Sequence, residues 1–425
     1  MGTFPQSLPL ALFWFIYMGA LGIFFPYYSL YLRENAGLSG TQVGLVLAMV
    51  PLVGMFAQPF WGQVADRTGA RGRVLAALAV GASLGYLALA SASGFPAIVA
   101  TTVALASFST AIIPMAVSVT LGMVHGSGPY AFGLFRVWGT LGYLLLVIAF
   151  PWFLRHYQEL RGSHGTSGQT SEAGLEVMFL VTAALVLASA LVGLFLPRKG
   201  TVALRAEKGD WRELFKNRAV IRFLFFVLVV YVLQAGPMWL FPLYVRARGG
   251  GLDTIRQMWI LMLVIEIPLV MSSGAGLKRL GSRGLLALGL LAGAIRWTVS
   301  GLSHDLQVIY PVQILHGVMV TGLILGGPLY LDAVVPGRLR STAQALLSVI
   351  GVGIGGIASN AGAGWLLQHV GADAPYIASG IGSLILGCLV WWILPSPESP
   401  EPQVSAMADR SRGQASPAEG NTPLP

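Results

Sequence analysis

Long apolar segments, separated by short polar loops, fill the chain up to about residue 395. An α-helix needs about 20 predominantly apolar residues to cross the hydrocarbon core of a bilayer. Twelve segments meet this length, at residues 8–32, 41–64, 73–93, 96–123, 131–154, 175–196, 221–245, 255–276, 284–303, 306–332, 342–367 and 373–394. The pattern predicts an all-α membrane protein with twelve transmembrane helices.

Composition leads to the same prediction. Hydrophobic residues make up 55% of the 425 residues, charged residues only 10%, and the mean hydropathy is +0.72. A soluble domain carries roughly 25% charged residues, so lipid must cover most of this surface. The chain has one cysteine, six scattered histidines and no haem, flavin or P-loop motif. We therefore expect no metal, no cofactor and no enzymatic activity.

Basic residues are distributed unevenly between the two sides of the predicted membrane. Cytoplasmic loops are enriched in Lys and Arg, so the basic side predicts the cytoplasm, and an even number of spans places both termini there. The net charge of +9 then reflects topology in the inner (plasma) membrane, and we expect no nucleic-acid partner. The basic side holds Arg67, Arg71, Arg73, Arg198, Lys199, Arg205, Lys208, Arg212, Lys216, Arg218, Arg222, Lys278, Arg279, Arg283, Arg338 and Arg340, and the other side holds Arg33, Arg155, Arg161, Arg246, Arg248 and Arg256.

The chain divides into two halves of six spans. The basic segment 197–219 is the expected linker between an N-terminal bundle, 1–196, and a C-terminal bundle, 220–395. The tail, 396–425, is rich in Pro, Ser, Glu and Gly and is expected to be disordered. The loops around Gly69 and Gly281 share glycines and arginines at a constant offset of 212 residues. This internal repeat predicts two related bundles with a central site between them.

The loop after the second span carries the most specific motif. Gly62, Asp66, Arg67, Gly69 and Arg71 form the pattern G-x-x-x-D-R-x-G-x-R. It resembles the cytoplasmic loop motif of the major facilitator superfamily, which implies the major facilitator fold of two pseudo-symmetric six-helix bundles, and a monomer. Glycine permits the tight turn, and the aspartate can cap a helix or pair with an arginine. We expect these five residues to form a conformational latch, the alternative being a solvated loop that only sets topology.

Two further stretches narrow the resemblance. Residues 25–32 read Phe-Pro-Tyr-Tyr-Ser-Leu-Tyr-Leu, with Gln-Pro-Phe-Trp-Gly at 58–62, and residues 132–139 read Phe-Gly-Leu-Phe-Arg-Val-Trp-Gly. These stretches are similar to lactose permease and its relatives, the oligosaccharide, nucleoside and phenylpropionate proton symporters. The resemblance covers about residues 8–395 and implies proton-coupled transport by alternating access.

Four ionisable residues within the predicted spans are candidates for the chemistry: Arg136, Glu266, Arg296 and His316. Each costs roughly 3 kcal/mol or more at the bilayer centre, so it needs a partner or a wet cavity. The related symporters carry a glutamate, an arginine and a histidine in spans 8, 9 and 10, where this chain has Glu266, Arg296 and His316. A dehydrated cavity favours a protonated carboxyl group and a nearby guanidinium favours the charged form, so movement of Arg296 against Glu266 would load or release a proton. The alternative is a structural triad that only joins three helices.

Helical spacing adds candidate substrate contacts. Trp259 lies two turns before Glu266, and Gln313 lies one turn before His316, so each pair shares a helix face. Tyr28 belongs to a row of aromatic residues in the first span, for which packing is the alternative explanation.

Arg136 is the principal substrate candidate in the first half. Tyr143, two turns further along the same span, matches the place where an aromatic residue stacks on the sugar in lactose permease. The acidic residue of that permease in span 4 is replaced here by Ser118, and a second acid in span 10 is replaced by Met319. Without these acids, Arg136 suits an anionic substrate such as an aromatic carboxylate.

The main functional prediction is proton-coupled uptake of a small organic solute, such as an aromatic acid, a nucleoside or a sugar-like molecule. The expected partners are this solute, the proton and the lipid bilayer. A proton-coupled drug efflux antiporter is the alternative, because it shares the fold and the loop motif. Efflux members usually carry a Gly-Pro motif in span 5, and residues 139–150 contain no proline. A membrane sensor that binds ligand without transporting it is a third reading.

Overall fold

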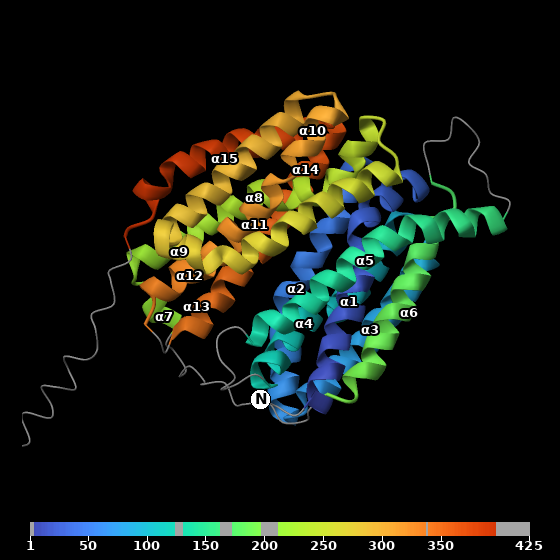
Figure 1. Cartoon of the computed structure of the whole chain (residues 1–425), viewed down its shortest axis with the longest axis horizontal. Coiled ribbons are helices and arrows are strands. Elements are labelled where there is room, and N and C mark those ends of the chain that lie inside the picture. The colour runs from blue at the N-terminus through green and yellow to red at the C-terminus, as the bar shows by residue number, and fades with distance from the viewer. Residues whose placement is uncertain (1–3, 124–130, 162–171, 197–210, 337–338, 397–425) are drawn as a thin grey trace, which may run out of the picture.

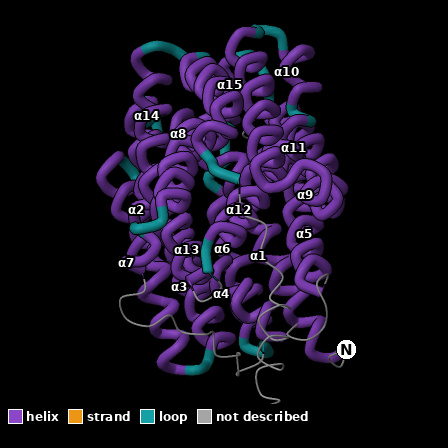
Figure 2. The backbone as a smooth tube through the Cα atoms, turned by 90° about the vertical axis from the view of Figure 1, so that its left-hand side faces the viewer, coloured by secondary structure: helices purple, strands orange, loops and turns teal. Residues whose placement is uncertain are grey.

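The computed structural model describes residues 4–123, 131–161, 172–196, 211–336 and 339–396, and these form a helical bundle (Figures 1 and 2). Most of the predicted linker and nearly all of the predicted tail lie outside the described residues. The first half contains α1 (Phe4–Leu30) with its π-helical extension η1 (Tyr31–Asn35), α2 (Gly40–Thr68), α3 (Arg71–Ala90), α4 (Phe95–Met123), α5 (Ala131–Leu160) and α6 (Val177–Gly193).

The second half begins with the short α7 (Trp211–Leu214). It continues with α8 (Arg218–Ala247), α9 (Leu252–Leu302), α10 (Leu306–Val312), α11 (Leu315–Val320), the π-helical turn η2 (Thr321–Leu325), α12 (Gly326–Val334), α13 (Arg340–Leu347), the π-helical stretch η4 (Ser348–Gly355), α14 (Gly356–His369) and α15 (Ala374–Ile393).

The predicted spans all lie on helices. In the described part of the chain, ten helices are long and apolar enough to cross a membrane. Of the other two predicted spans, one is α6, an apolar helix of 17 residues, and one is the part of α9 before Gly281. The helix α9 therefore covers two spans, which meet at the non-helical backbone of Gly281. The predicted all-α architecture is confirmed for the described residues.

The two halves lie side by side, with the first half blue to green and the second half yellow to red in Figure 1. Within the first half α1 packs along α5 and α3 along α6, and within the second half α9 packs along α15 and α11. The halves meet where α2 contacts α14, α5 contacts α9 and α1 contacts α8. The central site predicted from the sequence would lie at this boundary.

Small residues allow the closest helix contacts. A Cβ atom added at Gly142 on α5 would lie 1.9 Å from the carbonyl oxygen of Phe15 on α1. At the boundary between the halves, a Cβ atom at Gly44 on α2 would lie 2.8 Å from the Cα atom of Gly364 on α14. Glycine at both places lets the backbones approach as they do in membrane helix pairs.

Two turns reflect the internal repeat. Gly69, after α2, has φ +63°, and Gly281, within α9, has φ +66°, so the corresponding glycines both adopt the left-handed region that other residues rarely adopt. Both turns lie at the end of the bundle from which α1 starts, which we call the termini end. The loops 36–39, 248–251, 303–305 and 370–373 lie at the opposite end.

Candidate coupling and substrate site

Arg296 on α9 is a fully buried charge, with 0% of its surface exposed. Its Nε donates to Oε1 of Gln313 at 2.9 Å, and its Nη1 lies 3.0 Å from Nδ1 of His316. Its Nη2 faces the sulfur of Met262 at 3.4 Å, and its guanidinium lies 4.0 Å from the ring centroid of Trp297. Within the described residues, these neutral acceptors and rings, rather than a carboxylate, surround the guanidinium.

A helix break positions the two partners of Arg296. The helix α10 ends at Val312 directly after Pro311, and α11 begins at Leu315. Gln313, in the break, donates from Nε2 to the carbonyl oxygen of Ile309 at 2.9 Å, which orients its Oε1 toward Arg296. Gln313 is fully buried and both ends of its amide are bonded. The predicted substrate residue Gln313 is thus used in this structure to orient Arg296.

His316 connects Arg296 to Glu266. Arginine has only hydrogen-bond donors, so Nδ1 of His316 must accept, and the proton of the neutral ring lies on Nε2. Nε2 is 3.6 Å from Oε2 of Glu266. We expected Arg296 to act directly on Glu266, but the structure places the imidazole ring between them. The reason is that Glu266 belongs to the first part of α9 and faces α11, where Gly317 leaves room for its backbone.

Arg136 on α5 is the intramembrane charge of the first half, and α5 contacts α9, the helix that carries Glu266. The side chain of Glu266 is 20% exposed, and Arg136 is exposed. Arg136 lies 5.7 Å from the ring centroid of Trp14, and no direct ion pair joins it to Glu266 among the described contacts. Two opposite charges thus lie on helices of different halves that contact each other, and they are not directly paired among the described contacts.

Four aromatic residues from both halves form a layer beside this site, which we call the aromatic layer: Phe25, Tyr143, Trp239 and Trp259. The ring of Phe25 lies 3.9 Å from that of Trp239 and 5.5 Å from that of Trp259, and Tyr143 lies 6.0 Å from Trp259, centroid to centroid. Trp259 is 3% exposed and its indole N–H has no hydrogen-bond partner in the described structure.

The aromatic layer was only half predicted. Tyr143 and Trp259 were expected near the site, whereas Phe25 and Trp239 were not singled out as site residues. The sequence does not show whether an aromatic residue in a transmembrane span contacts the other bundle or contacts lipid, because both environments are apolar.

Tyr28 lies elsewhere. It is fully buried inside the first half, its hydroxyl is 2.8 Å from Oγ1 of Thr102, and its ring stacks on Phe24 at 4.4 Å. The structure therefore does not bring Tyr28 together with Glu266, and its surroundings are those of a packing residue.

The loop motif folds at the termini end. Asp66 forms an ion pair of 3.1 Å with Arg71, Arg67 is exposed, and Gly69 makes the turn between α2 and α3. Gly62 and Asp66 line a cavity of about 260 Å³ together with Arg71 and Ser118, between α2 and α4. A latch role for these residues remains a prediction.

The contacts of Arg296 give a stability prediction. In the variant Arg296→Lys, a single ammonium group cannot replace the planar guanidinium group with its several donors. The acceptor on Gln313 or on His316 therefore loses its donor. We expect the free energy of unfolding to fall by about 1–3 kcal/mol, measured by thermal unfolding of the purified protein in detergent. Arg155→Lys, at a half-exposed ion pair, is the control and should change little. Equal stability of the two variants would contradict this view of Arg296.

Comparisons with known proteins agree with this architecture. Residues 7–378 match the MFS_1 like family. The maltose permease of Geobacillus stearothermophilus is 31% identical over 399 residues, which cover 92% of this chain and 95% of the permease. The probable 3-phenylpropionic acid transporter of Escherichia coli (strain K12) is 26% identical over 376 residues, covering 85% of this chain and 91% of that protein. The structure of a mutant of the nucleoside transporter NupG superposes with a TM-score of 0.79, at 15% identity, over 92% of this chain and all of that one.

The chain belongs to the MFS_1 like family. It is a multi-pass membrane protein with the major facilitator fold and a secondary transporter of small solutes rather than an enzyme. The resemblance to the major facilitator superfamily, drawn from the loop motif, is thereby confirmed.

Proposed function

We propose that this transporter couples the uptake of a small organic anion to the uptake of a proton, by alternating access of a site between the two halves. Glu266 carries the proton and Arg136 binds the anionic group. The observation that supports this assignment is a pair of opposite charges on α5 and α9, two helices of different halves that contact each other, with no direct ion pair between them among the described contacts.

Charge balance explains why proton and anion would move together. In the empty carrier, ionised Glu266 balances Arg136. In the loaded carrier, protonated Glu266 is neutral and the anion balances Arg136. Both states carry the same net charge in the site, whereas a proton alone or an anion alone leaves one charge unbalanced. An unbalanced charge that must leave water during the change of conformation costs several kcal/mol, so the half-loaded carrier would change conformation rarely.

The Arg296 cluster supports this exchange from the second half. Arg296 holds His316 as the tautomer with its proton on Nε2, facing Glu266. Gln313 keeps Arg296 in place. In this proposal Arg296, Gln313 and His316 position the proton-carrying carboxyl group, while Tyr143 and Trp259 offer ring surfaces to the substrate.

The proposed topology follows from charge distribution. The termini end carries the excess of basic loop residues, so we place it in the cytoplasm of the cell and the opposite end outside. The two bundles, 1–196 and 220–395, would then rock about the central site, with the loop Gly62–Arg71 as a latch at the cytoplasmic end.

The substrate class is proposed from the same charges. An aromatic carboxylate provides an anion for Arg136 and a ring for the aromatic layer, and one relative is a probable 3-phenylpropionic acid transporter. A sugar is the second candidate, since the maltose permease is the more identical of the two relatives. Uptake of radiolabelled 3-phenylpropionate and maltose into vesicles with an imposed pH gradient, acid outside, tests both. Uptake that persists when a protonophore removes the gradient would contradict proton coupling.

The role of Arg136 is tested by the variant Arg136→Gln. Loss of a charged hydrogen bond to a carboxylate should weaken the binding of an aromatic acid by about 10- to 100-fold, measured as the shift in Kd of the purified protein. Trp138→Phe, at an exposed position on the same helix, is the control. If binding of the acid is unchanged while maltose binding is lost, the substrate is a sugar and the anion assignment is wrong.

A further inference from the structure

The opposite end of the bundle carries a cluster of charges from both halves. Arg246, on α8 of the second half, forms ion pairs with Glu34 of η1 at 3.0 Å and with Glu172, before α6, at 2.7 Å. The side chain of Glu34 is 7% exposed, and those of Arg246 and Glu172 are 23% and 26% exposed. We call these three residues the end clamp. It joins one cation of the second half to two carboxylates of the first half.

Further contacts join the halves beside the clamp. Arg155 on α5 pairs with Asp253 on α9 at 2.7 Å, and the backbone N–H of Gly40 donates to Oε1 of Gln368 on α14 at 2.8 Å. The aromatic layer also draws its members from both halves, and it includes Trp239, seven residues before Arg246 on α8, and Trp259, seven residues before Glu266 on α9. Ion pairs and aromatic contacts therefore both join the two halves toward the opposite end.

We propose that the end clamp is a gate that holds the opposite end closed in this conformation and must break in every transport cycle. Its chemistry suits reversible opening. Separation of the halves would return three charged groups to water, which repays much of the lost attraction. The closed interface is also imperfectly paired, since Oε2 of Glu34, the hydroxyl of Tyr27 and Nη1 of Arg256 are buried without hydrogen-bond partners among the described residues. Such groups lower the stability of the closed state relative to the hydrated, open one.

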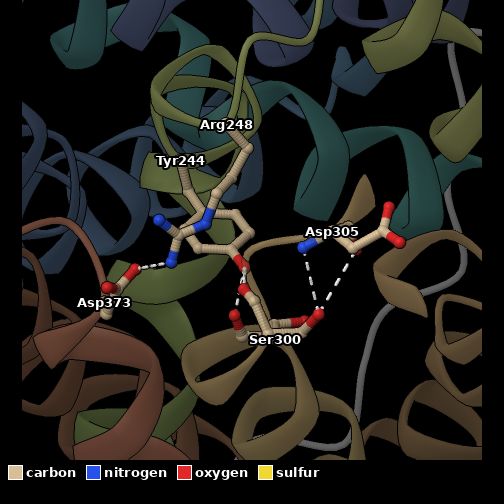
Figure 3. A network of polar contacts seen from close by, with 6 residues as sticks. Tyr244, Arg248, Ser300, Asp305 and Asp373 are labelled. Atoms are coloured by element: carbon tan, nitrogen blue, oxygen red, sulfur yellow. Dashed lines mark hydrogen bonds and ion pairs between the residues drawn. The ribbon is translucent and has the colours of Figure 1, made fainter. Parts of the chain in front are cut away.

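Arg248, two residues after Arg246, forms an ion pair within one half and therefore serves as a comparison for the end clamp, which joins both halves. Arg248 pairs with Asp373 and lies 5.1 Å from the ring centroid of Tyr244, whose hydroxyl donates to the carbonyl oxygen of Ser300 (Figure 3). All four residues belong to the second half, so their contacts move with it as one body. Breaking the Arg248 pair should therefore leave the balance between the two conformations unchanged.

Distances between spin labels test the gate. Exposed Ser93 and His304 lie in loops at the opposite end, one in each half, and can be replaced by cysteine after Cys388 is changed to alanine. We expect Arg246→Gln to raise the ratio of long to short distances by about tenfold, because the closed form loses its clamp. Arg248→Gln should leave the distance distribution as in the parent. Unchanged distances in Arg246→Gln would overturn the proposal.

Exchange of charges provides a second test that does not depend on how well one variant folds. The double variant Glu34→Arg with Arg246→Glu keeps one cation and two carboxylates in the clamp. It should restore the short distances that Arg246→Glu alone loses, and failure to restore them would contradict a direct ionic gate. The gate rests on alternating access but not on the proton assignment. The distances are measured without substrate or pH gradient, so failure here would leave the proton-coupling test unaffected.

Discussion

Replacement of Glu266 by glutamine is expected to abolish substrate accumulation driven by a pH gradient while exchange across the membrane continues. Glutamine has nearly the shape of the protonated side chain but cannot release a proton. The loaded carrier keeps its charge balance, whereas the empty carrier has Arg136 without a counter-charge and returns slowly. One coupled proton and one unit of pH difference would support about tenfold accumulation in the parent protein, and the variant should reach equal concentrations on both sides.

The measurement compares uptake and counterflow in proteoliposomes with the same preparation. Glu159→Gln removes an exposed carboxylate at the far end of α5 and should behave as the parent does. Exchange by Glu266→Gln should also lose its dependence on pH, because the proposed titrating group is gone. Accumulation against a gradient by this variant would show that another residue carries the proton, or that none does.

The largest effect on stability is expected from Gly142→Ala. The added Cβ atom would lie 1.9 Å from the carbonyl oxygen of Phe15 and 2.9 Å from its Cα atom. Both are backbone atoms, so no side chain can rotate away, and α1 and α5 must move apart along their whole contact. Overpacking commonly costs about 1–3 kcal/mol, and this clash with backbone should exceed that range. We expect a large loss of folded protein, measured by size-exclusion chromatography and thermal unfolding in detergent.

Gly362→Ala is the matched control, since a Cβ atom there meets nothing within 4 Å. In a helix the change from glycine to alanine normally gains up to about 1 kcal/mol, so this variant should be as stable as the parent or slightly more stable. If Gly142→Ala proves equally stable, the close approach of α1 and α5 is not required for folding.

The sequence predicted the elements better than the site. Span positions follow from the length of apolar segments, and the two turns at Gly69 and Gly281 follow from a repeat visible in the loops. In the site, three of the four intramembrane charges were correctly expected to lie near one another, yet the order was different, with His316 between Arg296 and Glu266. Spacing along one helix gives a face but not the side chain opposite, so contacts between helices could not be ordered.

Charged residues in the loops also show that the sequence does not identify contacts between distant segments. Arg155, Arg246 and Arg248 counted in the sequence only as basic residues on the less basic side. The structure shows that each pairs with a carboxylate, two of them across the boundary between the halves. Their partners are distant in sequence, and nothing in the sequence around a charged loop residue identifies the residue with which it pairs.

The sequence alone determined that this chain is a polytopic membrane protein of two related halves. Helices that cross lipid must be long and apolar, which is visible in the composition, and the repeat in the loops relates the two halves. It also singled out Arg136 and Glu266, because a charge in hydrocarbon is too costly unless it has a partner or a wet cavity. Only the tertiary structure decided that His316 lies between Arg296 and Glu266, that Tyr28 packs inside one bundle, and that ion pairs and aromatic contacts join the halves toward one end. These contacts depend on how helices that are distant in sequence cross each other. That crossing geometry cannot be derived from a single sequence.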